Sequence, residues 1–146
     1  MLKIQERARF IWGLNSISDM SASKITVERF YVENASQLGL KLLAGASGLK
    51  RVIKEPTVNR PGLALSGFTK YFASKRIQAM GSAEVTYLKT LTEEERKKRY
   101  EEICKHRIPC FVFSRNLKPD RDFLKVAEEA NIPVFRCPLI TMKFIN

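Results

Sequence analysis

The spacing of hydrophobic residues changes several times along this chain and predicts alternating helices and strands. In the segment 26–38, hydrophobic side chains recur three or four residues apart, which is typical of an amphipathic helix. Thr26 is suited to cap the start of this helix and Gly39 to end it. Short apolar runs follow at 40–45 and 49–54, and the turn residues between them predict a β-hairpin.

The second half of the chain alternates more regularly. Compact apolar runs predict three strands, at 76–81, 108–114 and 132–136. Polar or amphipathic segments predict three helices, at 82–91, 92–106 and 119–132. Ser82 and Thr92 are suited to cap the first two of them. Strands separated by helices favour a sheet with parallel pairs. The expected fold is therefore α/β, a small mixed parallel/antiparallel sheet flanked by helices.

The ends of the chain fall outside this pattern. Residues 1–23 show weak periodicity and a serine-rich stretch, so we expect a flexible extension there, followed by one domain over 24–140. No apolar run approaches the roughly 18 residues that span a bilayer. The three cysteines form no C-x-x-C pair and are interpreted as reduced thiols; they are Cys104, Cys110 and Cys137. We therefore expect a cytoplasmic protein that does not engage a membrane.

Charge is distributed unevenly. The formal net charge is +11, from 26 basic and 15 acidic residues. Between Lys41 and Arg76 there are eight basic residues against one acid, Glu55. Such a basic region attracts phosphates, nucleic acid, anionic lipid or an acidic partner.

Motifs for enzymatic chemistry are missing from the sequence. The string GASGLKR at 45–51 does not match the phosphate-binding pattern G-x-x-x-x-G-K-[ST], because Leu49 precedes Lys50 and Arg51 replaces the hydroxyl residue. No other window matches that pattern, so we do not expect this chain alone to hydrolyse ATP or transfer its phosphate by that route. The single histidine, His106, is interpreted as a surface or helix-capping residue, and no zinc-type spacing predicts a metal site.

Aromatic and basic residues are interleaved at 68–78. The aromatic residues are Phe68, Tyr71 and Phe72, and the basic ones are Lys70, Lys75 and Arg76. Rings and cations in this pattern can bind nucleic acid. We interpret the rings as core packing with the cations outward, because that arrangement is more common.

The loop 55–72 holds two prolines and two glycines around an Asn-Arg pair. Pro61 fixes its own backbone and restricts Arg60 to an extended conformation. Gly62 and Gly67 permit close approach of a ligand or another backbone. A preorganised arginine suits an anion or a partner surface. The alternative is a rigid connection in which Arg60 pairs with an internal acid. The residues alone favour neither interpretation over the other.

Several strings of this sequence resemble one family. LLAGASGLKRVI, NRPGLALSGF and RIQAMGSAEVTYL occur in order, followed by IPC and IPVFRCPL. Over residues 25–146 the chain resembles the N-terminal domain of bacterial HPr kinase/phosphorylase. That resemblance implies a fold similar to the N-terminal domains of muramyl ligases. Residues 141–146 resemble the start of a linker toward a kinase domain.

The resemblance also implies an activity that this chain does not carry alone. The family enzyme phosphorylates and dephosphorylates a serine of HPr in carbon catabolite regulation, and is typically a hexamer. Its C-terminal domain, beyond the matching sequence, uses ATP and magnesium. The implied partners are that kinase domain, HPr bound through it, and other copies of the chain in a homo-oligomer. Because the family's catalytic motifs lie in the kinase domain, the resemblance carries no catalytic residue over to this chain, and no cofactor is expected in it.

A candidate site combines the motif with its conformational constraints. We place it at Asn59, Arg60, Pro61, Gly62 and Gly67, with surrounding positive potential from Lys50, Arg51, Lys75 and Arg76. The favoured hypothesis is a noncatalytic regulatory and assembly domain. A binding domain for a phosphorylated metabolite or nucleotide-sugar is the second hypothesis, and a basic nucleic-acid-binding module is the third. The absence of a recognised nucleic-acid motif weighs against the third.

Overall fold

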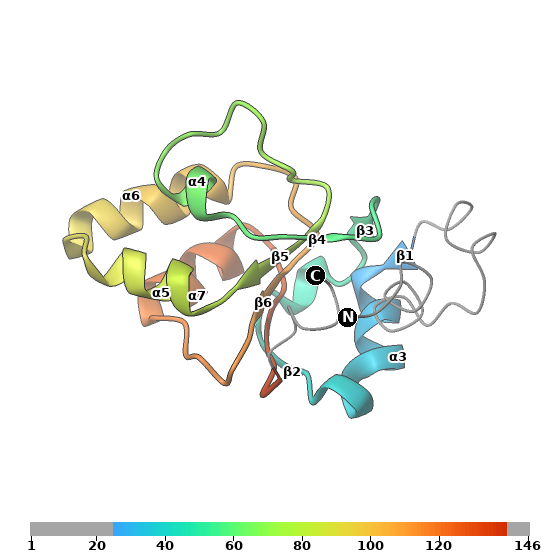
Figure 1. Ribbon diagram of the computed structural model, residues 1–146. Helices are drawn as coiled ribbons and strands as arrows, with labels where there is room; N and C mark the ends of the chain where they lie inside the picture. The colour runs from blue at the N-terminus through green and yellow to red at the C-terminus, as the bar shows by residue number, and fades with distance from the viewer. Residues whose placement is uncertain (1–24, 140–146) are drawn as a thin grey trace.

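The computed structural model describes residues 25–139, so the expected extension at 1–23 and the linker at 141–146 lie outside the described residues. These residues form an α/β domain around a five-stranded sheet with the order β2-β7-β6-β5-β4 (Figure 1). The strands are β2 (Lys41–Ala44), β4 (Val58–Asn59), β5 (Ile77–Met80), β6 (Phe111–Phe113) and β7 (Val134–Arg136). Four are parallel and β2 is antiparallel to β7, which confirms the expected mixed sheet.

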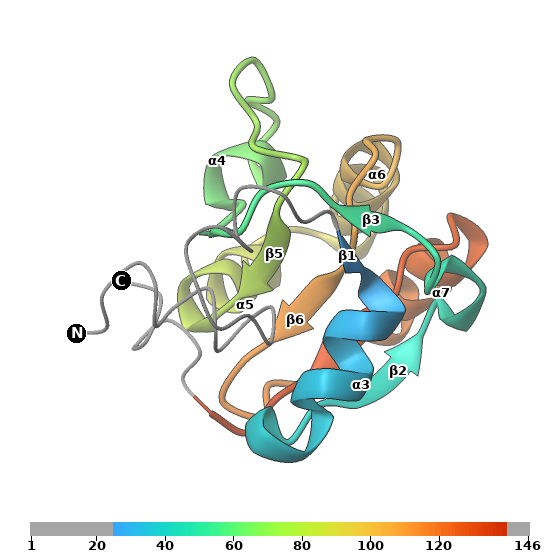
Figure 2. The same cartoon turned by 90° about the vertical axis from the view of Figure 1, so that its right-hand side faces the viewer.

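Helices cover both faces of this sheet. One face packs against α3 (Val27–Leu38), which Figure 2 shows in front of the strands. The other face carries four helices, α4 (Gly62–Leu65), α5 (Ser82–Lys89), α6 (Glu93–Ile103) and α7 (Arg121–Glu129). They share a face because β4 to β7 are successive neighbours, and right-handed crossovers then place every connecting helix on the same side. None of the helices between 25 and 139 is long and apolar enough to cross a bilayer.

Local capping signals explain where the helices begin and end. Thr26 Oγ1 accepts a hydrogen bond from the Arg29 amide at 3.1 Å, and Gly39 ends α3 in the left-handed conformation at φ 67°. Thr92 caps α6 as predicted. The start of α5 differs from its prediction by one residue. Gly81 is the N-cap instead of Ser82, because the Glu84 side chain accepts the Gly81 amide at 2.7 Å.

The predicted hairpin over 40–54 is wrong. β2 pairs with β7, placing Leu42 opposite Phe135, while β3 (Val52–Ile53) pairs with β1 (Ile25–Thr26) in a separate two-stranded sheet. Between β2 and β3 the chain forms a short 3₁₀ helix, η1 (Ala46–Gly48). A Cβ atom on Gly48 would lie 1.8 Å from the Asn131 carbonyl oxygen. This turn is therefore shaped by close packing onto the chain ahead of β7.

Candidate functional site

The loop of the candidate site begins at the carboxyl edge of the sheet. Because β4 and β5 are parallel, Arg60 after β4 and Gly81 after β5 lie at the same edge. Arg60 donates through Nη2 to Glu84 Oε1 at 2.8 Å, and the same oxygen accepts the Gly81 amide at 2.7 Å. Glu84 is 5% exposed, whereas the Arg60 side chain is 43% exposed. Arg60 thus pairs with an internal acid and keeps part of its guanidinium in solvent.

Asn59 is held from the neighbouring strand. Its Nδ2 donates to Gln78 Oε1 at 2.8 Å. Gln78 is buried, and its Nε2 donates to the carbonyls of Ala73 and Arg76, both at 2.9 Å. The amide pair therefore ties the end of β4 to the loop that leads into β5.

The proline and glycines of the site have three different environments. Pro61 is buried and immediately precedes α4. Gly67 adopts φ 105°, and a Cβ atom there would lie 2.8 Å from Arg99 Nη1. Gly62 has room for a side chain, since the nearest atom to a Cβ added there would be Glu84 Oε2 at 3.9 Å. Only Gly67 is therefore required by its backbone conformation.

An apolar surface lies beside this loop. Leu63, Phe68 and Tyr71 are 71%, 53% and 82% exposed, and all three border a cavity of about 130 Å³ that Asn59 and Arg60 also line. We call these three residues the α4 surface. The predicted inward packing of the aromatic rings is wrong for Phe68 and Tyr71. The chain leaves the sheet after β4, and between α4 and β5 it runs as a long loop that extends away from the rest of the domain (Figure 1), where these two rings are exposed.

Phe72 and His106 form a half-buried contact below that surface. Their ring centroids lie 5.1 Å apart in an edge-to-face arrangement. His106 follows α6 and belongs to no group of three or more potential metal ligands among the described residues. Its position is that of a packed residue at a helix end.

The four cations expected around Arg60 lie at the opposite edge of the sheet from it. Arg76 precedes β5, at the amino edge, and pairs with Glu55 at 2.7 Å. Arg51 lies at the same edge, where it donates to the carbonyls of Ile108, Ala130 and Asn131. Lys50 and Lys75 line a cavity with Arg51 there. The structure therefore does not place these four cations around Arg60.

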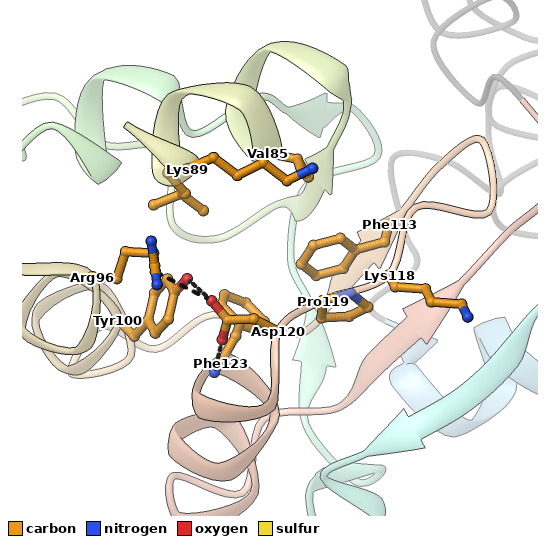
Figure 3. A pocket seen from close by; sticks show the side chains of 10 residues that line it. Val85, Lys89, Arg96, Tyr100, Phe113, Lys118, Pro119, Asp120 and Phe123 are labelled. Carbon is orange, nitrogen blue, oxygen red and sulfur yellow. Dashed lines mark hydrogen bonds and ion pairs between the residues drawn. The ribbon is translucent and has the colours of Figure 1, made fainter. Parts of the chain in front are cut away.

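Another cavity, of about 190 Å³, lies between α5, α6 and the start of α7 (Figure 3). Tyr100 donates its hydroxyl to Asp120 at 2.5 Å, while Asp120 also accepts the Phe123 amide at 2.8 Å as the cap of α7. Arg96 lies 3.6 Å from the same carboxylate. Burial, followed by the hydrogen bond to Asp120, raises the pKa of Tyr100 well above its ordinary value. The phenol stays protonated and joins two helices.

Sequence reasoning missed both Glu84 and Tyr100. The string GSAE carries a signal for Glu84, because its glutamate stands three residues after the cap. Tyr100 is harder to recognise, because α6 consists mostly of charged residues and Tyr100 and Ile103 are its buried residues. Their spacing of three residues marks the inward face of that helix.

The thiols are unsuited to nucleophilic chemistry. Cys110 and Cys137 are buried, and burial raises the pKa of both. Burial also raises the pKa of the half-buried Cys104 to about 12. Among residues 25–139, no three His, Cys, Asp or Glu side chains gather as a metal site would require.

Comparison with known proteins now gives the family. Residues 25–146 match the family described as HPr Serine kinase N terminus. An HPr kinase/phosphorylase of Chloroherpeton thalassium is 41% identical over 123 residues, which cover 83% of this chain and 36% of the relative. One of Listeria monocytogenes serotype 4a is 40% identical over 107 residues, which cover 73% of this chain and 34% of the relative. The chain thus spans about a third of the length of these relatives.

A solved structure supports the fold. The crystal structure of the CBS and DRTGG domains of the regulatory region of Clostridium perfringens pyrophosphatase, complexed with its activator diadenosine tetraphosphate, matches with a TM-score of 0.53. The match covers 88% of this chain and 54% of that chain at 12% identity, so it bears on the fold alone. The family match and the relatives at about 40% identity confirm the resemblance drawn from NRPGLALSGF and its neighbouring strings. This chain belongs to the HPr serine kinase N-terminal family.

Proposed function

We propose that this chain is the noncatalytic regulatory and assembly domain of an HPr kinase/phosphorylase. The phosphorylation and dephosphorylation of HPr, with ATP and magnesium, belong to the kinase domain in the remaining length of such an enzyme. The matched residues span only 36% of the Chloroherpeton thalassium relative. The sequence contains no phosphate-binding pattern of the P-loop type. Kinase chemistry is therefore assigned to the part of the enzyme outside this chain.

The α4 surface is the observation that carries the assembly role. Its leucine and two aromatic residues are exposed around one cavity; exposed apolar patches mark interaction sites, and aromatic residues are enriched at protein interfaces. The Arg60–Glu84 pair fixes the adjoining loop, so the surface is ordered before a partner binds. We propose that its partner is another part of the full-length enzyme, either the kinase domain or a neighbouring subunit.

A chimaeric enzyme tests this function. Residues 25–146 replace the matched segment of the Chloroherpeton thalassium relative, with or without Leu63→Ser and Tyr71→Ser. The measurements are phosphoserine formation on HPr, its reversal, and the sedimentation of the enzyme. Val32→Ser is the control, because Val32 is 72% exposed but lies on α3, on the other face of the sheet.

We expect the α4-surface variant to change assembly or the balance of the two activities, and the control to match the parent chimaera. Equal behaviour of all three proteins would refute a role for the α4 surface. Phosphorylation of HPr by the 146-residue chain alone would show that the domain is catalytic.

The alternative of anion capture by Arg60 is less well supported. Glu84 already neutralises this guanidinium at 2.8 Å, and a ligand would have to compete with a buried carboxylate. A contact of this loop with protein requires no such exchange. The nucleic-acid alternative is weakened in turn. Lys70 Nζ lies 5.5 Å from the centroid of the Tyr71 ring, but Lys75 lies at the amino edge of the sheet, where Arg76 is paired with Glu55, so these two cations do not lie beside the exposed rings.

A further inference from the structure

A second candidate site lies at the amino edge of the sheet, opposite the Arg60 loop. A cavity of about 620 Å³ opens there between β3 and the segments that lead into β5 and β6. Of its nine lining residues, five are basic and none is acidic. The basic residues, which together we call the basic cleft, are Lys50, Arg51, Lys54, Lys75 and Arg107.

Most of these cations have no partner within the described part of the chain. Between residues 25 and 139, no hydrogen bond or ion pair engages the side chains of Lys50, Lys54, Lys75 or Arg107. All four residues are exposed. Exposed cations of one sign around a hollow concentrate positive potential within it.

The backbone holds two of the lysines together. The Lys54 amide donates to the Lys75 carbonyl at 3.3 Å, so the two residues lie on adjoining segments. Glu55, the acid next to Lys54, is paired with Arg76 at 2.7 Å. The Glu55 carboxylate therefore does not neutralise the two lysines. A bound anion would reduce the electrostatic repulsion between them.

Arg51 makes one wall of the cleft rigid. Its guanidinium donates to the Asn131, Ile108 and Ala130 carbonyls at 2.7, 2.9 and 2.8 Å. These bonds connect the segment before β3 to the chain ahead of β6 and β7. A site whose walls are fixed before binding loses less conformational entropy when a ligand enters.

We infer that the basic cleft binds a small molecule carrying two or more phosphate groups. Its volume falls in the range of roughly 300–1,000 Å³ typical of small-molecule sites. Several unpaired cations suit several phosphates, and Ser74 adds a hydroxyl donor. Val52, Ile108 and Pro109 supply an apolar lining for the uncharged part of such a molecule.

The shape and lining favour this ligand over nucleic acid. The cations converge on one hollow from three segments instead of following a long groove. No aromatic residue lines the cleft, so bases would find no ring on which to stack. The inference goes beyond the proposed function and does not depend on it, because the α4 surface lies at the other edge of the sheet.

Calorimetric titration of the 146-residue chain with sodium tripolyphosphate tests the inference, at an ionic strength of about 0.15 M. We expect saturable binding of one tripolyphosphate per chain. The double variant Lys54→Gln/Lys75→Gln should weaken it at least about tenfold. The matched control, Lys97→Gln/Lys98→Gln, removes the same charge from the exposed face of α6 and should leave the affinity unchanged.

Three outcomes would overturn the inference. One is the absence of saturable binding by the parent chain. Another is equal weakening in both lysine double variants, which would indicate general charge attraction. The third is displacement of tripolyphosphate by a single-stranded DNA of about 20 nucleotides that binds more tightly and with a steep salt dependence, which would identify a nucleic-acid site. Circular dichroism of each variant shows that its fold is intact.

Discussion

Arg60 and Glu84 form an ion pair of 2.8 Å between an exposed guanidinium and a buried carboxylate. The pair joins the turn after β4 to the turn after β5, since Glu84 also accepts the Gly81 amide. A Cβ atom on Gly81 would lie 2.7 Å from Arg60 Nη2. The close approach of these residues fixes the base of the loop that carries the α4 surface.

Removing this pair should destabilise the domain. Arg60→Ala leaves Glu84 buried with only the Gly81 amide as its described partner, and we expect the free energy of unfolding to fall by about 1–2 kcal/mol. Urea denaturation measures the change. Lys125→Ala is the control, because Lys125 is exposed on α7 and has no described side-chain partner. Identical midpoints for the Arg60 variant and the parent would show that the pair contributes nothing to stability.

Local signals in the sequence were sufficient for most of the helices and strands. Thr26, Gly39 and Thr92 act through neighbours only three or four residues away, so their roles can be read from spacing. The hairpin prediction failed because strand pairing is not a local property. β2 pairs with a strand that begins at Val134, and nothing in the sequence of β2 specifies that distant partner.

The candidate site was predictable only in part. The NRPG string and its constrained backbone drew attention to Arg60, but Glu84 becomes its partner only through the parallel pairing of β4 and β5. Arg76 is close to Arg60 in sequence, yet it lies at the opposite edge because the chain leaves one strand and enters the next at different ends. Closeness in sequence therefore wrongly predicted that these cations would surround Arg60.

The same substitution should be costly at one glycine and nearly neutral at another. At Gly45, with φ 77°, a Cβ atom would lie 2.1 Å from the Ile132 carbonyl oxygen, so Gly45→Ala should cost about 2 kcal/mol or more. At Gly62 the nearest atom would be 3.9 Å away, and Gly62→Ala should change stability by no more than about 0.5 kcal/mol. Thermal unfolding measures both. A large loss at Gly62 would contradict the open environment described for it.

Burial should protect the thiols from modification. Cys110 and Cys137 are fully buried, and the Cys137 thiol donates to the Leu38 carbonyl at 3.0 Å. Burial raises the pKa of all three cysteines, to about 12 for Cys104, so little thiolate forms at neutral pH. Reaction with a chromogenic disulfide near neutral pH should be slow in the folded chain, with Cys104 modified first, and rapid for all three in denaturant. A fast reaction of Cys110 or Cys137 before unfolding would contradict this order.

Tyr100 should make stability fall at high pH. Its pKa is raised in the folded state by burial and by the hydrogen bond to Asp120, so the unfolded chain loses this proton first as pH rises. The stabilisation is complete below the ordinary tyrosine pKa of about 10 and decreases as pH rises above it. Tyr100→Phe should lower stability by about 0.5–1.5 kcal/mol at neutral pH and flatten the alkaline decline. Tyr71→Phe is the matched control, since Tyr71 is 82% exposed. Urea denaturation between neutral pH and about pH 11 compares the three proteins, and an equally steep alkaline decline in Tyr100→Phe would show that another group causes it.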